Sequence, residues 1–80
     1  MSEVLTELQG IVEALVDVPD AVELTEEDVG ETQLIEVGVD NSDLGKVIGR
    51  QGRTVRSLRT LLEVRGAETG TYYDLEILEG

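Results

Sequence analysis

The tetrapeptide Gly49-Arg50-Gln51-Gly52 constrains the fold of this chain more than any other feature, because it places two glycines three residues apart between two helical patterns. Glycine adopts backbone conformations that are closed to other residues, so the chain can turn sharply here and approach a ligand closely. The helical pattern resumes directly after Gly52, which points the free N–H groups and the positive dipole end of a helix toward the same turn. This arrangement suits a phosphate group.

The basic residues of the chain are confined to one segment around this turn. They are Lys46, Arg50, Arg53, Arg56, Arg59 and Arg65. Only one of the 18 acidic residues, Glu63, falls between positions 46 and 65, so this segment carries a net charge of +5 within a chain whose total is −12. Because charges more than about 10 Å apart are largely screened at about 0.1 M salt, the local charge decides contact with a ligand. The segment is therefore a candidate anion site, and the acidic remainder should lower non-specific affinity.

The composition excludes several classes of function. The 80 residues suffice for one domain, 1–80. Cysteine and histidine are absent, which excludes disulfides and thiolate metal sites and removes the usual general base. We therefore expect no enzyme activity, no metal, no cofactor and no small-molecule substrate. The N-terminus lacks the basic region of a signal peptide, and no stretch approaches the roughly 18 apolar residues of a membrane span, so we expect a cytoplasmic protein without membrane contact.

Hydrophobic periodicity predicts one helix and two strands in the first half of the chain. Apolar residues at helical spacing predict a helix over 3–18, with Ser2 as its N-cap and Pro19 ending it. Alternating residues predict strands over 21–25 and 32–39. The acidic run at 26–28 lies between them, and we interpret it as part of a solvated hairpin loop because it lacks the spaced ligands of a calcium site.

The second half of the chain predicts a helix–turn–helix unit over 43–65 and a strand over 71–78. Capping residues at 40–43 start the first short helix, and a second helix follows Gly52 and frays by Gly66, with a loop over 66–70. Arg53, Arg56 and Arg59 step by three along this helix and form a basic ridge. The predicted fold class is α+β, in the order helix, strand, strand, helix, helix, strand, with a three-stranded sheet and helices packed on one face.

The nine residues from Val47 to Val55, VIGRQGRTV, resemble the VIGxxGxxI core of the KH domain. The element order is similar to the type II arrangement of that fold, and the whole chain resembles the small stand-alone bacterial KH proteins of the KhpA type. Segment 44–49 fits the helix that leads into the GXXG turn of these proteins, and segment 16–20 fits their acidic stretch containing proline. The resemblance implies that the GXXG turn clamps about four nucleotides of single-stranded RNA.

On matching positions, the resemblance implies a set of RNA-binding residues. The amides of Gly49 and Gly52, with Arg50, Gln51 and Arg53, would hold phosphates, and Lys46 and Arg56 would extend the basic wall. The bases would lie on Val47, Ile48 and Val55, with part of the 32–39 strand as the floor; the alternative for these aliphatic residues is ordinary core packing, which we expect for Leu58. The alternative for the glycines is a tight helix–helix connection without a ligand.

The resemblance also implies partners and a role. The expected ligand is single-stranded RNA, and the expected role is that of a post-transcriptional regulator or RNA chaperone, in the regulation of cell shape and the cell wall. The resemblance implies a homodimer, or a heterodimer with a second KH-containing protein. The alternative function is a protein-interaction or dimerisation module in which RNA binding is weak or lost.

Overall fold

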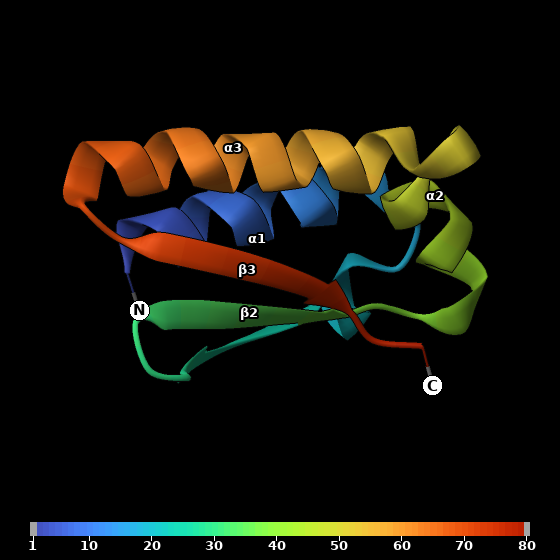
Figure 1. Ribbon diagram of the computed structural model, residues 1–80. Coiled ribbons are helices and arrows are strands. Elements are labelled where there is room, and N and C mark those ends of the chain that lie inside the picture. The colour runs from blue at the N-terminus through green and yellow to red at the C-terminus, as the bar shows by residue number, and fades with distance from the viewer. Residues whose placement is uncertain (1, 80) are drawn as a thin grey trace.

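The computed structural model describes residues 2–79 and confirms the predicted α+β fold and the order of its elements (Figure 1). The helices and strands are α1 (Glu3–Leu15), β1 (Glu23–Asp28), β2 (Thr32–Gly38), α2 (Leu44–Ile48), α3 (Arg53–Thr69) and β3 (Tyr72–Ile77). Single turns of 3-10 helix lie at Pro19–Ala21, Asn41–Asp43 and Arg50–Gly52. The last of these is the GXXG turn, and it joins α2 to α3.

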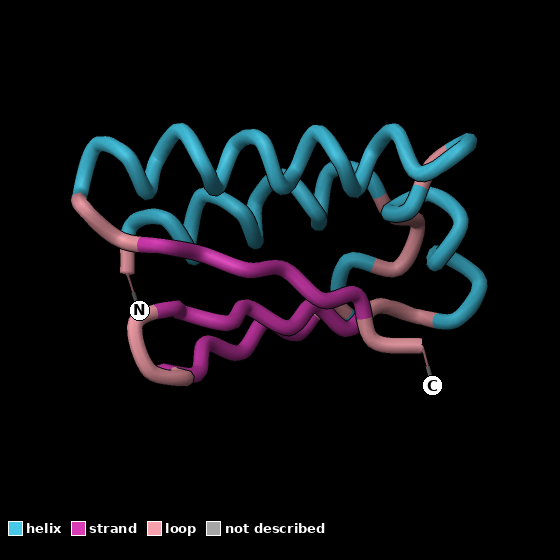
Figure 2. Tube along the Cα trace, in the orientation of Figure 1, coloured by secondary structure: helices cyan, strands magenta, loops and turns pink. Residues whose placement is uncertain are grey.

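The three strands form one sheet in the order β1-β2-β3 (Figure 2). β1 pairs with β2 in the antiparallel sense, and β2 pairs with β3 in the parallel sense. A parallel pair cannot be joined by a tight turn and needs a crossover connection, which α2, the turn and α3 provide. This crossover lays α3 along β3, on the same face of the sheet as α1.

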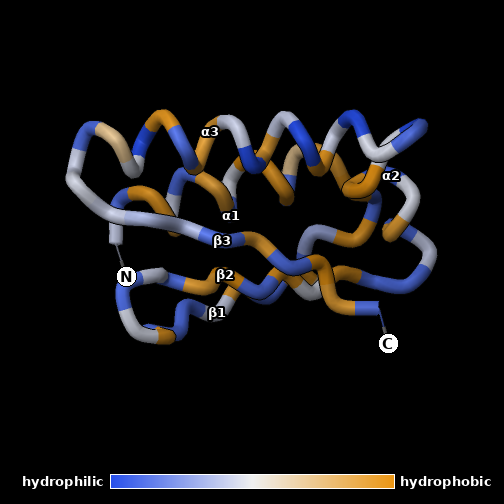
Figure 3. The backbone as a smooth tube through the Cα atoms, in the orientation of Figure 1, coloured by the Kyte–Doolittle hydropathy of each residue, from blue (hydrophilic) through white to orange (hydrophobic). Residues whose placement is uncertain are grey.

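The core lies between this face of the sheet and the helices, where apolar residues of both layers meet (Figure 3). α1 contributes the buried side chains of Val4, Leu5, Leu8 and Val12 at helical spacing. Ile35 and Val37 of β2 are completely buried, as their alternation predicts, and Leu58 of α3, which we expect in the core, is only 4% exposed. Among residues 2–79, no helix covers the opposite face of the sheet.

α1 begins as the sequence predicts and ends earlier. The hydroxyl of Ser2 accepts a hydrogen bond from the Leu5 N–H at 3.1 Å, which confirms the N-cap. The helix ends at Leu15 instead of continuing to residue 18. The reason is tertiary: the N–H groups of Asp17 and Val18, which a longer helix would use internally, donate to the side chain of Asp43.

The acidic run at 26–28 belongs to a strand, so its interpretation as a loop is wrong. β1 starts at Glu23, two residues later than predicted, and pairs through Asp28, where Glu26 lies opposite Ile35. Only Val29–Glu31 then connect the strands, with Gly30 at φ +90°. Backbone pairing with β2 outweighs the low strand propensity of these residues, and charged side chains on an edge strand discourage pairing with another chain.

α3 extends four residues beyond the predicted end, through the expected loop at 66–70. Gly66 lies inside the helix and is buried, and the helix ends at Thr69 with Gly70 in the left-handed conformation at φ +73°. A Cβ on Gly66 would lie 2.2 Å from the backbone oxygen of Thr71. The glycine therefore serves the close approach of α3 to the start of β3, and Gly70 is the residue that ends the helix.

Candidate nucleic-acid interface

The backbone of the turn adopts conformations that glycine makes accessible. Gly49, the C-cap of α2, has φ 77° and ψ 169°, and Gly52 is left-handed at φ 72°. Gln51 between them is also left-handed, at φ 57°, and it is the one non-glycine residue with positive φ in the described part of the chain. Such a residue is strained by about 1–3 kcal/mol and persists only where its surroundings hold it. No side chain caps the N-terminus of α3 at Gly52. However, the N–H groups of Gly52 and Arg53 donate to the backbone oxygens of Gly49 and Arg50, and that of Gly49 donates to Gly45. The amides of Gly49 and Gly52, which the sequence predicts to hold phosphates, are therefore already paired within the protein.

The two glycines of the turn are required for different reasons. A Cβ on Gly49 would lie 2.2 Å from the Thr54 hydroxyl and 2.8 Å from the Thr54 backbone nitrogen, so this position excludes any side chain. A Cβ on Gly52 would meet only Val55, at 3.9 Å, so here only the backbone conformation favours glycine. The strained Gln51 is held from the side, because its Oε1 accepts a hydrogen bond from Arg53 Nη2 at 3.1 Å.

The six basic residues fall into two groups, according to whether the protein already uses their charge. Arg50, Arg53, Arg56 and Arg59 are exposed, and within residues 2–79 none of the four forms an ion pair with a carboxylate. Lys46, in contrast, pairs with two aspartates. Arg65 pairs with Glu68 and lies 3.9 Å from a carboxylate oxygen of α1. The available positive charge is therefore concentrated at the turn and in the first turns of α3.

Arg59, the third member of the predicted ridge, is turned toward the sheet. Its Nη2 donates to the backbone oxygen of Leu75 at 3.3 Å, and the Leu75 N–H donates to Asp74 Oδ1 at 2.9 Å. Successive N–H groups of a strand point to opposite sides. The N–H of Leu78 donates to Val37 of β2, so the N–H and C=O groups of Leu75, three residues earlier, point away from β2 to the free edge of β3. The strand beside α3 is thus β3, and β2 lies one strand further into the sheet.

The aliphatic residues predicted to contact bases differ in exposure. Val47 is completely buried and Val55 is only 9% exposed, and both belong to the hydrophobic core. Ile48, the last residue of α2, is partly exposed. Of these three residues, Ile48 alone presents apolar surface, whereas Val47 and Val55 lie in the core.

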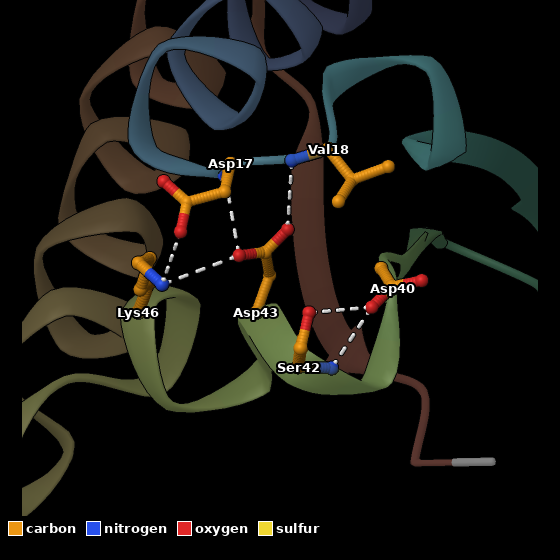
Figure 4. Close-up of polar contacts among 6 residues, drawn as sticks. All are labelled: Asp17, Val18, Asp40, Ser42, Asp43 and Lys46. Atoms are coloured by element: carbon orange, nitrogen blue, oxygen red, sulfur yellow. Dashed lines mark hydrogen bonds and ion pairs between the residues drawn. The ribbon is translucent and has the colours of Figure 1, made fainter.

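A polar cluster that the sequence does not reveal joins the end of α1 to the start of α2 (Figure 4). The completely buried Asp43 carboxylate accepts the N–H groups of Asp17 at 3.1 Å and Val18 at 3.0 Å. Lys46 Nζ lies 3.4 Å from the same carboxylate and 3.0 Å from the Asp17 carboxylate. Burial raises the pKa of Asp43, but these hydrogen bonds outweigh it and leave that pKa below its usual value. The hydrogen bonds to Asp17 and then to Asp43 raise the pKa of Lys46.

Sequence reasoning assigned these residues to other roles. The capping residues predicted at 40–43 include both aspartates. The Asp40 carboxylate caps this segment by accepting the N–H of Ser42 at 3.0 Å, whereas Asp43, the N-cap residue of α2, makes no side-chain cap hydrogen bond. The spacing of Asp43 and Lys46, three residues apart on a helix, was the available signal for their contact. Nothing in the sequence indicated the contact with Asp17, because it joins segments 26 residues apart.

A hollow of about 440 Å³ lies at the other end of α3, between the last turns of the helix and the start of β3. Its lining includes Gly66, Ala67, Tyr72 and Tyr73 and one charged residue, Glu63. A carboxylate without a neighbouring cation is unsuited to an anionic ligand. Among residues 2–79, no three carboxylates gather as a metal site would require, and no helix is long and apolar enough to cross a membrane.

Comparison with known proteins identifies the family. The family model described as "KhpA/KhpB, KH domain" matches residues 6–77, nearly the whole chain. This chain belongs to the KhpA/KhpB KH-domain family. Among its relatives, the RNA-binding protein KhpA of Aquifex aeolicus is 51% identical over 65 residues, which cover 81% of this chain and 82% of the relative. The RNA-binding protein KhpA of Borreliella burgdorferi is 42% identical over 72 residues, which cover 90% and 88% of the two chains.

Solved structures show the same fold inside a larger protein. A variant of Era from Aquifex aeolicus, bound to GDP and AlF4, superposes with a TM-score of 0.64 over 92% of this chain, at 14% sequence identity. Era in complex with MgGDPNP and nucleotides 1506–1542 of 16S ribosomal RNA superposes equally well, at 15% identity. The match covers only 29% and 28% of the two Era chains, so this protein corresponds to under a third of Era. At this identity the likeness shows the fold alone.

Proposed function

We propose that this KhpA/KhpB-family chain is a cytoplasmic, non-catalytic protein that binds single-stranded RNA through the GXXG turn at 49–52. The observation that carries the proposal is the coincidence of a sharp, glycine-dependent turn with three exposed arginines that no carboxylate neutralises. The names of the relatives, which describe them as RNA-binding proteins, support the same ligand. The structure of Era with ribosomal RNA concerns a protein that shares this fold.

The turn acts on the RNA backbone. The side chains of Arg50, Arg53 and Arg56 hold successive phosphates beside the positive dipole end of α3, and Gln51 adds a polar side chain at the tip. Gly49 brings the two helices close together, so the RNA backbone approaches the peptide backbone without a side chain between them. These contacts position the strand and carry no sequence information.

The bases of the bound strand then face the partly exposed Ile48 and the free edge of β3. A single strand is favoured over a duplex, because unstacked bases present edges and faces that a groove can contact. The acidic charge outside segment 46–65 repels RNA from the remaining surface. Binding is therefore restricted to the turn. We propose that the transient capture of single-stranded segments there makes the protein a post-transcriptional regulator or RNA chaperone.

Assembly with a second copy or with another KH-containing protein is the second candidate function. The side chains of Val64 and Tyr72 are 56% and 73% exposed, and large exposed apolar side chains favour contact with a partner. The family model covers both KhpA and KhpB. Sedimentation of the purified chain, alone and with RNA, separates the two functions: self-association without RNA binding would favour assembly as the main role.

The test of RNA binding is the affinity for a short single strand as a function of salt. Three neutralised phosphates give a log–log slope of about −2, since each contributes about −0.7 on single strands. The double variant Arg50→Asp, Gln51→Asp should lose measurable binding while it remains folded by circular dichroism. Thr6→Asp, Gln9→Asp, which adds negative charge on α1, should keep the slope. A slope near zero for the unmodified chain, or full affinity in the turn variant, would refute the proposal.

A further inference from the structure

The positive charge of Lys46 is already balanced by two carboxylates of the protein. Nζ lies 3.0 Å from one carboxylate oxygen of Asp17 and 3.4 Å from one of Asp43. Its side chain is 45% exposed, and the Asp17 side chain is 76% exposed, so one of its two partners faces solvent. A phosphate that replaced these partners would leave the buried Asp43 carboxylate with one partner fewer and would place negative charges side by side. Lys46 thus differs from the exposed arginines of the turn.

Asp43 is the one charged side chain among residues 2–79 that is completely buried. A buried carboxylate is tolerated only when hydrogen bonds and a counter-charge compensate for the loss of water. Here two backbone N–H groups and Lys46 fulfil this requirement. All three donors are needed at fixed positions, so the cluster determines how the chain after α1 lies against the start of α2.

This attachment is close to the RNA-binding turn. α2 has only five residues, and its C-cap is Gly49. Asp43 immediately precedes the helix, and Lys46 lies in its middle, so the cluster holds α2 on the side of α1. A helix of five residues has little stability of its own in water. The orientation of the turn therefore depends on contacts that α2 makes with the rest of the protein, among which this cluster is the polar one.

We infer that Lys46 is a positioning residue for RNA binding and not a phosphate ligand: with Asp17 and Asp43 it fixes α2 to the end of α1, and so orients the turn at 49–52. The inference rests on the proposed RNA binding and assigns a role to a cluster that RNA contact itself does not use. The resemblance to KH domains implies a different role, in which Lys46 contacts phosphates together with Arg56.

The salt dependence of binding distinguishes a phosphate ligand from a positioning residue. Lys46→Met removes the charge and keeps an unbranched side chain only one atom shorter, and Arg56→Ala is the matched loss of one cation that has no carboxylate partner. We expect the slope to stay near about −2 in Lys46→Met and to fall in magnitude to about −1.4 in Arg56→Ala. If the magnitude of the slope also fell by about 0.7 in Lys46→Met, this result would assign a phosphate to Lys46 and overturn the inference.

A pair of aspartate variants tests the positioning step itself. Asp43→Asn and Asp40→Asn each remove one negative charge from the same segment, so electrostatics alone would raise RNA affinity in both. Asn serves as a helix cap as well as Asp does, so Asp40→Asn should keep or slightly increase affinity. The amide of Asp43→Asn cannot accept both N–H groups and leaves a buried donor unpaired, and we expect the affinity of the folded variant to fall about tenfold.

Nuclear magnetic resonance separates this loss from simple unfolding. In the free Asp43→Asn variant, the amide signals of Gly49 and Gly52 should shift while that of Ile35 in β2 stays in place. Unchanged or increased affinity in Asp43→Asn would overturn the inference and leave the proposed function intact. If the unmodified chain does not bind RNA at all, the proposed function fails, and the inference fails with it.

Discussion

The two glycines of the turn allow a direct test of how the turn obtains its shape, because the same substitution should have unequal effects at the two positions. Gly52 is left-handed with open space around it, so Gly52→Ala introduces only backbone strain, about 1–2 kcal/mol. The lower entropy of the unfolded alanine variant offsets about 0.4–1 kcal/mol of that strain. The expected net loss in the free energy of unfolding is therefore about 1 kcal/mol, the difference between these two effects.

Gly49→Ala combines strain with collision. The backbone at φ 77° and ψ 169° lies in a region used almost only by glycine, and the new Cβ would lie 2.8 Å from the backbone nitrogen of Thr54. Since backbone cannot move aside like the end of a flexible side chain, we expect a loss of about 3–4 kcal/mol, the sum of strain and overpacking. For a chain of this size the stability itself is only about 4–12 kcal/mol, so the variant should be marginally folded.

Urea unfolding followed by far-ultraviolet circular dichroism measures both losses. A change in midpoint at constant m-value reports stability, and the two midpoints should differ clearly. Equal losses at Gly49 and Gly52, or a loss below about 1 kcal/mol at Gly49, would refute the claim that the Cβ collision determines this turn.

Three further predictions concern the helix, the arginines and the buried carboxylate. Gly66→Ala, a change that normally stabilises a helix by about 1 kcal/mol, should destabilise this one in thermal unfolding because its Cβ meets the Thr71 oxygen; a raised melting temperature would contradict this. Arg59→Ala should leave the salt slope of RNA binding unchanged, unlike Arg56→Ala, because its guanidinium is held at the Leu75 oxygen on the edge of β3 instead of at the turn. The pKa of Asp43 is lowered on folding, so its contribution to stability is complete above the unfolded pKa of about 3.9 and is lost as pH falls through the folded value. The stability difference between the unmodified chain and Asp43→Asn should accordingly be large at neutral pH and shrink below about pH 4, and a constant difference in acid urea titrations would contradict it.

Features that depend on neighbouring residues along the chain could be predicted from the sequence. The cap at Ser2 is local, and the alternation around Ile35 requires only knowledge of strand geometry. The sharp turn at 49–52 follows from the two glycines and the helical patterns on either side. The order of the elements, and with it the fold class, then follows from these local signals.

Features that depend on contacts between distant segments could not be predicted. Local sequence predicts a helix end at Gly66, whereas the close approach of Thr71 that requires this glycine inside α3 appears only in the folded chain. The apolar pattern predicts that α1 continues to residue 18, whereas the carboxylate that binds the amides of residues 17 and 18 comes from the distant Asp43. The acidic composition of 26–28 predicts a loop, whereas pairing with β2 outweighs that local propensity.

In the candidate site, too, local features could be predicted from the sequence and contacts between distant segments could not. The exposed arginines and the turn are located by sequence alone, since both are properties of one segment. The sequence cannot tell that Lys46 and Arg59 are bonded within the protein, or that Val47 is completely buried. Charge counted along the chain therefore overestimates the positive charge that carboxylates leave unpaired, because Lys46 and Arg65 form ion pairs within the protein. Arg50, Arg53, Arg56 and Arg59 form none among residues 2–79, and of these Arg59 is bonded to the Leu75 oxygen.

The central claim is that RNA binds this protein at the turn, and an amide-resolved titration of the labelled chain with short random single-stranded RNA tests it most directly. We expect the largest shifts from residue 48 to residue 53, smaller ones through residue 56 and at Leu75 on the free edge of β3, and none at Glu27 on strand β1. Shifts centred on the sheet or on the far end of α3, or none at low salt, would contradict it.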